Sequence, residues 1–279
     1  MKWKLGEISG IGVFIHWSFW LLPAWIMYSS LGAGGGMSEA LGSVAFIFAV
    51  FACVVMHEFG HAFAARYFGI GTRDITLYPI GGVASLNRIP RNPLHELVIA
   101  VAGPAVNVAL AAALFLALSL GFGAGVPAAS GFDGSFLSGL LVMNVILVVF
   151  NMIPAFPMDG GRVLRAFLAM SLPYSRATEI AAKVGQGVAV VLAIVGLWQQ
   201  LPTLLLVAAF VFLAAKAEAN MVRMQDAYAG HGPIEILDAE KEPVAHRQFA
   251  PEDGIVWATE VRTVDPRTGL VRVFRYPTR

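Results

Sequence analysis

The stretch SEALGSVAFIFAVFACVVMHEFGHAFAARY, residues 38–67, decides how this sequence is interpreted. It is mostly apolar and exceeds the roughly 20 residues that a helix needs to cross a bilayer. It nevertheless contains His57, Glu58 and His61. Ionisable side chains inside a membrane helix are costly and mark a functional site unless they are paired. The stretch therefore predicts a membrane helix with a polar site built into it.

The composition supports a membrane protein. Of 279 residues, 57% are hydrophobic and 13% are charged, and the mean hydropathy is +0.71. The 19 Lys and Arg nearly balance the 18 Asp and Glu, so no basic surface for nucleic acid is expected. The single cysteine, Cys53, excludes a disulfide framework and a cysteine zinc site.

Further apolar stretches predict an all-α polytopic membrane protein with about six transmembrane helices. The predicted spans are residues 11–30, 38–67, 94–121, 135–152, 184–201 and 202–222. The last two meet at Gln199, Gln200, Leu201 and Pro202, which indicates a tight turn because proline is tolerated in the first turn of a helix.

The positive charges predict the orientation, since cytoplasmic loops retain Lys and Arg. All 19 fall on one side of the predicted spans. We therefore expect an integral protein of the cell (inner) membrane with cytoplasmic N- and C-termini. Residues 1–224 form the predicted membrane domain, and residues 225–279 form a small cytoplasmic tail. In that tail, residues 256–264 and 270–276 alternate around a turn sequence, which predicts a β-hairpin.

The His-Glu-x-x-His arrangement predicts a metal site. Residues four apart on a helix face the same way, so His57 and His61 can bind one ion. Glu58 would take a proton from a water at the metal and return one to the leaving amine. The alternative is a paired helix interior without metal.

Asp159 is the candidate for the third protein ligand that a catalytic zinc requires. Pro154 and Pro157 interrupt the helix after Asn151, and broken backbone at membrane depth is tolerated where it lines a cavity. From the predicted orientation, this segment and His61 reach similar depths. The alternative is that Asp159 only caps the helix that follows it.

Four motifs in order resemble those of the site-2 protease family of intramembrane zinc metalloproteases. They are His57-Glu58-x-x-His61, Pro79-x-Gly81-Gly82, Ala102-Gly103-Pro104-x-x-Asn107 and Asn151-x-x-Pro154-x-x-Pro157-x-Asp159-Gly160. The resemblance implies one zinc ion per chain, bound by His57, His61 and Asp159. It also implies Glu58 as general base and Asn151 near the substrate carbonyl. The residues after the last span are too few for the paired CBS module of many six-span members.

Other motif residues leave alternatives open. The Asn151 amide could donate to an oxyanion, or it could satisfy helix carbonyls freed before Pro154. Residues 72–86 predict extended structure with a tight turn. In the resembled family this small membrane-embedded β element lies beside the cleft, so Gly81 and Gly82 could bind an unwound substrate by strand addition. A purely structural role is the alternative.

Two further groups are predicted to have structural roles. Gly103, Pro104 and Asn107 are expected to set close helix packing more than chemistry. His95 and Glu96 open a span on its cytoplasmic side, where we expect them at the level of the lipid headgroups.

The sequence thus predicts a zinc metalloendopeptidase that hydrolyses peptide bonds in or near transmembrane segments of membrane proteins. Its expected partners are a membrane protein substrate and the lipid bilayer, with no nucleic acid; no oligomeric state is predicted. The alternatives are a non-catalytic metal or solute carrier that uses the same ligands and a scaffold that binds helices. Glu58 favours hydrolysis, because a carrier has no need of a base beside a ligand.

Overall fold

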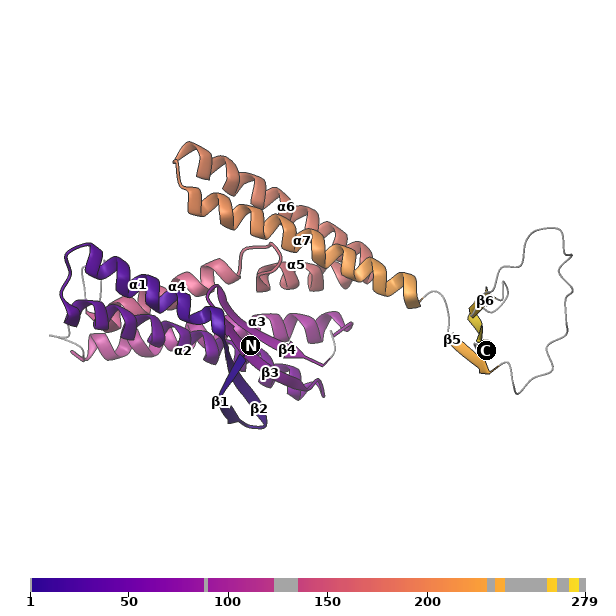
Figure 1. The fold of residues 1–279 in the computed structure, drawn as a ribbon, viewed down its shortest axis with the longest axis horizontal. Helices are drawn as coiled ribbons and strands as arrows, with labels where there is room; N and C mark the ends of the chain where they lie inside the picture. The colour runs from indigo at the N-terminus through magenta and orange to yellow at the C-terminus, as the bar shows by residue number, and fades with distance from the viewer. Residues whose placement is uncertain are drawn as a thin grey trace, which may run out of the picture. The chain divides into compact units, whose positions relative to one another are not determined.

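The computed structural model describes residues 2–87, 90–122, 135–229, 234–238, 260–264 and 271–275, with side chains as far as residue 224. The chain divides into two compact units, Met1–Glu218 and Ala219–Arg279. The first unit consists of helices and one small sheet (Figure 1). All predicted site residues belong to this unit.

The sheet of the first unit has four strands in the order β1-β2-β3-β4. Strand β1 (Lys2–Ile8) is antiparallel to β2 (Ile11–His16), β2 is parallel to β3 (Thr72–Tyr78), and β3 is antiparallel to β4 (Gly81–Leu86). Side chains of β2 and β3 pack on helix α2 (Met37–Tyr67) in two buried clusters: Ile11, Val13, Ile75, Phe59 and Ala62; and Ile15, Leu77, Phe51 and Phe19. The sheet is therefore fixed to the helix that carries the His-Glu-x-x-His motif.

The predicted span over residues 11–30 is wrong in its first part. Its beginning is strand β2, followed by a 3-10 turn (Trp17–Trp20) and the 12-residue helix α1 (Leu21–Gly32). A helix of 12 residues is about 18 Å long, which is less than the roughly 30 Å of a hydrocarbon core. The apolar run of β2 is explained instead by the burial of Ile11, Val13 and Ile15 against α2. The predicted hairpin at 72–86 is confirmed as β3 and β4, within a larger sheet than expected.

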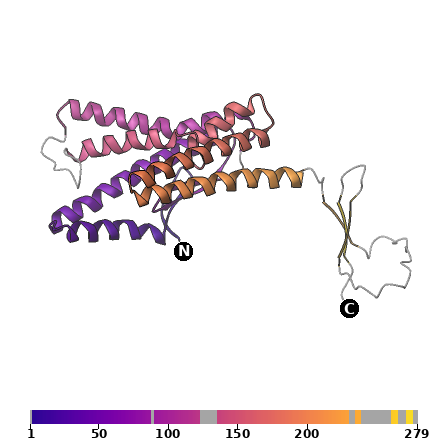
Figure 2. The ribbon, with the colours of Figure 1, turned by 90° about the horizontal axis from the view of Figure 1, so that it is seen from above.

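Within the described ranges, six further helices follow the two N-terminal strands and α1. They are α2 (Met37–Tyr67), α3 (Pro93–Ser119), α4 (Phe136–Asn151), α5 (Asp159–Ala169), α6 (Tyr174–Trp198) and α7 (Pro202–Ala229). Among the described residues, α2, α3, α6 and α7 are long and apolar enough to cross a membrane, and α4 is a shorter apolar helix. Figure 2 shows α6 and α7 as neighbouring helices, joined by the predicted tight turn before Pro202.

The segment between α4 and α5 is irregular but tightly packed. Ala155 and Met158 are buried with Ala189 of α6 and Val211 of α7. A Cβ atom at Gly161 would come within 2.7 Å of the Phe156 backbone nitrogen, so only glycine fits there. This packing holds the beginning of α5, and hence Asp159, in one place.

A buried ion cluster joins three helices of the first unit. Arg165 of α5 donates two hydrogen bonds to Glu96 Oε1 of α3, at 2.8 and 2.5 Å, and one to Glu218 Oε1 of α7, at 2.6 Å. The Arg165 and Glu96 side chains are only 2% and 3% exposed. The expectation that Glu96 lies among the lipid headgroups is therefore wrong, because Arg165 provides it with a buried partner.

The second unit contains a small three-stranded sheet in the order β5-β7-β6. Strands β6 (Glu260–Val264) and β7 (Val271–Arg275) are antiparallel, as the predicted hairpin requires, and β5 (Ile234–Asp238) adds a parallel strand. Residues 256–259 and the turn of that hairpin lie outside the described residues.

The ion cluster leads to a stability prediction. Replacing Arg165 by Met should lower the free energy of unfolding by about 3–5 kcal/mol, because two carboxylates would lose a shared buried partner. The apparent melting temperature in one detergent measures the effect. The control is Lys183→Met, which removes the 70% exposed partner of Glu179 and should cost no more than about 1 kcal/mol. Equal melting temperatures for the two variants would contradict the proposed contribution of the Arg165 ion cluster to stability.

Candidate metal site

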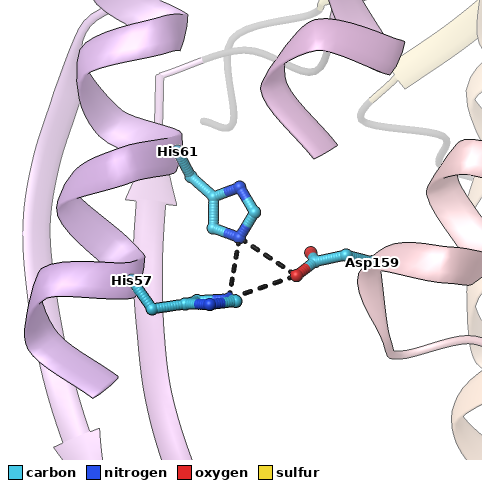
Figure 3. Close-up of side chains that lie close together, drawn as sticks. All are labelled: His57, His61 and Asp159. Atoms are coloured by element: carbon cyan, nitrogen blue, oxygen red, sulfur yellow. Dashed lines mark hydrogen bonds and ion pairs between the residues drawn. The ribbon is translucent and has the colours of Figure 1, made fainter. Parts of the chain in front are cut away.

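The two histidines of the motif lie on one face of α2 and are both 5% exposed. Asp159 is the first residue of α5 and is 7% exposed. Figure 3 shows the two imidazoles and the carboxylate pointing toward a common point. The structure therefore brings together the three side chains predicted as ligands, although about 100 residues separate α2 from Asp159 in sequence.

The three facing atoms form a nearly equilateral triangle. His57 Nε2 lies 3.0 Å from His61 Nε2 and 3.2 Å from Asp159 Oδ2, and His61 Nε2 lies 3.1 Å from the same oxygen. Tetrahedral ligands about 2.0–2.1 Å from a zinc ion are about 3.3 Å apart. The triangle therefore matches three ligands of one zinc ion, and it is the metal-ligand group found among the described residues.

The outer ring nitrogens show which atoms face the centre. His57 Nδ1 lies 2.5 Å from Asn107 Oδ1, and His61 Nδ1 lies 2.6 Å from the Ile99 carbonyl oxygen. Both oxygens accept, so each Nδ1 carries the proton and each Nε2 presents a lone pair. Two lone pairs and a carboxylate at this spacing repel one another unless a cation lies among them. The donor set therefore fits a metal ion.

Asp159 does not act as a helix cap. The N-cap residue of α5 is Met158, and no side-chain hydrogen bond caps this helix. The Asp159 carboxylate points instead toward the two imidazoles (Figure 3). The capping alternative is therefore not what the structure shows.

Gly103 of α3 makes room for the two ligands of α2. A Cβ atom at position 103 would contact the His57 and His61 imidazoles, and one at Gly60 of α2 would contact the Ala102 carbonyl of α3. Gly103 thus lets α3 approach α2 closely, as predicted, and Gly60 contributes from the other helix. The absence of a side chain at position 103 also leaves space for the two imidazoles, which the prediction of helix packing did not include.

Glu58 lies beside the ligands and is half-buried. Its Oε2 accepts a hydrogen bond from the Ala84 backbone N–H of β4, at 3.2 Å. A Cβ atom at Gly82 would lie 2.9 Å from Glu58 Cγ, so Gly82 lets the strand approach the carboxylate. Gly81, with φ of 142°, closes the β3–β4 turn in a conformation that favours glycine.

Asn151 is the last residue of α4, and its Nδ2 donates to the Leu147 carbonyl at 2.9 Å. This contact agrees with the alternative in which the amide satisfies a helix carbonyl. Contact between Asn151 and a substrate carbonyl stays a prediction.

Asn107 has a second role that its assignment to packing missed. It is fully buried on α3, and its side-chain oxygen accepts from the ring of a proposed ligand, His57. The signal was present in the sequence, because an amide inside an apolar helix is costly without a partner. The identity of that partner was not predictable, since it depends on how α3 packs against α2.

The fold and site define a class: a helical membrane protein with a zinc-peptidase donor set, His-Glu-x-x-His on one helix and an aspartate from another. The family model described as "Peptidase family M50" matches residues 45–136 and 125–192. The chain belongs to this family, the site-2 protease family.

Known relatives agree with that assignment. "Zinc metalloprotease MJ0392" of Methanocaldococcus jannaschii is 35% identical over 222 residues, which cover 80% of this chain and 62% of the relative. The chain thus spans less than two thirds of that relative's length. The solved structure titled "Site-2 Protease from Methanocaldococcus jannaschii" matches with a TM-score of 0.59 and 35% identity, covering 78% of this chain and 95% of that one.

The Gly103 contact leads to a prediction about metal binding. Gly103→Ala should lower zinc affinity about 10-fold or more, because the new methyl group must displace a ligand imidazole. Elemental analysis after competition with a chelator measures the loss. Gly187→Ala is the matched control, since a Cβ atom there meets nothing within 4 Å on helix α6. Wild-type zinc retention in Gly103→Ala would show that the imidazoles do not need this space.

Proposed function

We propose that the protein is an intramembrane zinc metalloendopeptidase that hydrolyses peptide bonds in or near transmembrane segments of other membrane proteins. The observation that carries the proposal is the triangle of His57, His61 and Asp159 atoms with Glu58 beside it. A peptidase needs both features, a three-ligand metal site and an adjacent base. Family membership and the names of the relatives support the same reaction.

His57, His61 and Asp159 would hold the zinc ion, one per chain. When bound, zinc would polarise the scissile carbonyl and acidify the attacking water. The Glu58 carboxylate would take one proton from that water as its oxygen bonds to the carbonyl carbon. Glu58 would then deliver the proton to the leaving nitrogen as the carbon–nitrogen bond breaks. Water is thereby divided between the new carboxyl and amino groups.

Strand β4 is the proposed docking edge for the unwound substrate. It lies at the end of the strand order, so one of its edges is not paired within the sheet. The Ala84 N–H on that edge points to Glu58, and Gly82, two residues earlier, shares the same edge. We propose that Gly81 and Gly82 receive the substrate backbone there by strand addition.

Asn151 is the proposed donor to the substrate carbonyl oxygen. A side-chain amide has two N–H donors, and the contact with Leu147 uses one of them. The second could be donated to a developing oxyanion. Its position at the end of α4, directly before the irregular segment that leads to Asp159, supports this role.

The alternatives are a metal or solute carrier and a helix-binding scaffold. A carrier would require the three metal ligands and a scaffold would require the helices, but neither requires Glu58. The role of this carboxylate therefore separates an enzyme from the other two classes.

Variants of Glu58 and Asp159 test the proposed chemistry. Glu58→Gln should retain zinc but reduce cleavage of a reconstituted transmembrane substrate at least about 100-fold, because glutamine cannot take up the proton. Asp159→Ala should lose both zinc and cleavage. Zinc content and product formation are measured on the same samples. If Glu58→Gln cleaves at the wild-type rate, the protease mechanism fails; if Asp159→Ala keeps all its zinc, the ligand set fails.

We also propose that the N- and C-termini face the cytoplasm of a cell (inner) membrane. Two contacts of strand β1 and of the turn after it support a common side for the cations before α1 and after α2. Lys2 Nζ bonds Asp74 Oδ2 at 2.7 Å, and Arg66 donates to the Ser9 carbonyl at 3.0 Å. The hydrogen bond from Lys2 holds the pKa of the Asp74 carboxyl below its ordinary value. The basic residues before α1 and after α2 thus belong to one end of the molecule.

Cysteine labelling tests this orientation in intact cells, in a Cys53→Ala background. A cysteine at Gly34, between α1 and α2, should react with an impermeant reagent added outside. A cysteine at Asn92, the N-cap of α3, should react only after the membrane is opened. The reverse pattern would invert the proposed orientation, because positive loops stay inside.

A further inference from the structure

We propose that Asn107 and Asn144 form an amide relay that fixes the tautomer of His57, so that its Nε2 lone pair faces the metal. This inference rests on the metal site of the proposed function. It assigns a positioning role to Asn144 of α4, a residue that no motif distinguishes. Both asparagine side chains are fully buried, with relative exposures of 0%.

The relay begins at a group that can only accept. Asn144 Nδ2 lies 2.8 Å from the carbonyl oxygen of Leu140, one helical turn earlier on α4. A carbonyl has no proton to donate, so the nitrogen of the amide must face it. The same nitrogen lies 3.4 Å from Cys53 Sγ of α2, a weak acceptor. The Asn144 amide therefore has one favoured orientation, with Oδ1 turned toward α3.

That orientation determines the next two contacts. Asn144 Oδ1 accepts from Asn107 Nδ2 at 2.8 Å, which turns Asn107 Oδ1 toward His57. This oxygen lies 2.5 Å from His57 Nδ1, so the ring nitrogen must donate. A neutral imidazole has one N–H, and with the proton on Nδ1 the other nitrogen is left as a ligand. Reversing either amide would make two donors or two acceptors face each other.

The two histidines thus reach the same state by different routes. His61 Nδ1 contacts a backbone carbonyl, that of Ile99, directly. His57 reaches the carbonyl of Leu140 through two side-chain amides. In both cases the final acceptor is a helix carbonyl, whose direction is fixed by the backbone. The rival explanation is that the amides only bind α3 to α4 as interhelical hydrogen bonds.

The test measures zinc retention of the purified full chain against a graded chelator. Asn144→Leu removes the relay while keeping the number of side-chain heavy atoms and the branch at Cγ, which frees the Asn107 amide to turn. We expect zinc affinity to fall about 10- to 100-fold, the usual effect of losing such an outer contact. Asn107→Asp supplies a carboxylate that accepts from His57 in either orientation. In the double variant no amide oxygen faces that carboxylate, so it should recover zinc affinity relative to Asn144→Leu, which a loss of helix packing would not allow.

Thr178→Val is the matched control. The buried Thr178 hydroxyl donates to the Tyr174 carbonyl, one turn earlier on the same helix, α6. The variant should keep wild-type zinc affinity. Wild-type affinity in Asn144→Leu, or a failure of Asn107→Asp to restore affinity in the Asn144→Leu background, overturns the relay. If Asn144→Leu does not fold, Asn144→Ala takes its place, alone and combined with Asn107→Asp, and equal zinc loss in these two variants overturns the relay. Absence of zinc from the wild-type protein would instead defeat the proposed function.

Discussion

The repulsion among three electron-rich atoms is the constraint on which this structure depends. Two imidazole nitrogens and one carboxylate oxygen lie 3.0–3.2 Å apart in a buried position. Such an arrangement is stable only with a cation at its centre and with rigid support behind each ligand. The support comes from main-chain and amide acceptors behind the imidazoles and from the packed segment that precedes Asp159. The fold therefore holds the ligand residues of α2 and α5 close to one common point.

The ligands were predictable because their signal is local. His57 and His61 share a helix face by spacing alone, and two prolines mark the broken segment before Asp159. The tight turn before Pro202 was predictable for the same reason. The role of Asn144 was not predictable, because a single amide in an apolar helix belongs to no spacing pattern that indicates its partner. Its contact with Asn107 arises from the packing of α3 against α4.

The two errors of sequence interpretation have one physical origin, since hydropathy does not show which surface covers a residue. The apolar side chains of strand β2 are covered by helix α2, and such an apolar run resembles the start of a membrane span. Glu96 opens an apolar helix, where a headgroup position is reasonable, yet Arg165 of a distant helix covers it. To predict either case correctly, one would have to know which segments, far apart in sequence, pack against each other.

In the proposed function, the exposure of the site residues favours a substrate that approaches from the side of Glu58. The three proposed ligands are 5–7% exposed, whereas Glu58 is half-buried and lies against the edge of β4. Its hydrogen bond to the Ala84 N–H satisfies a backbone donor that would otherwise lack a partner away from water. In the proposed function, a substrate strand that pairs with β4 brings a carbonyl to that same donor. Pairing would then release the Glu58 carboxylate from Ala84 when the peptide arrives, so that substrate docking and availability of the base are coupled through one backbone amide.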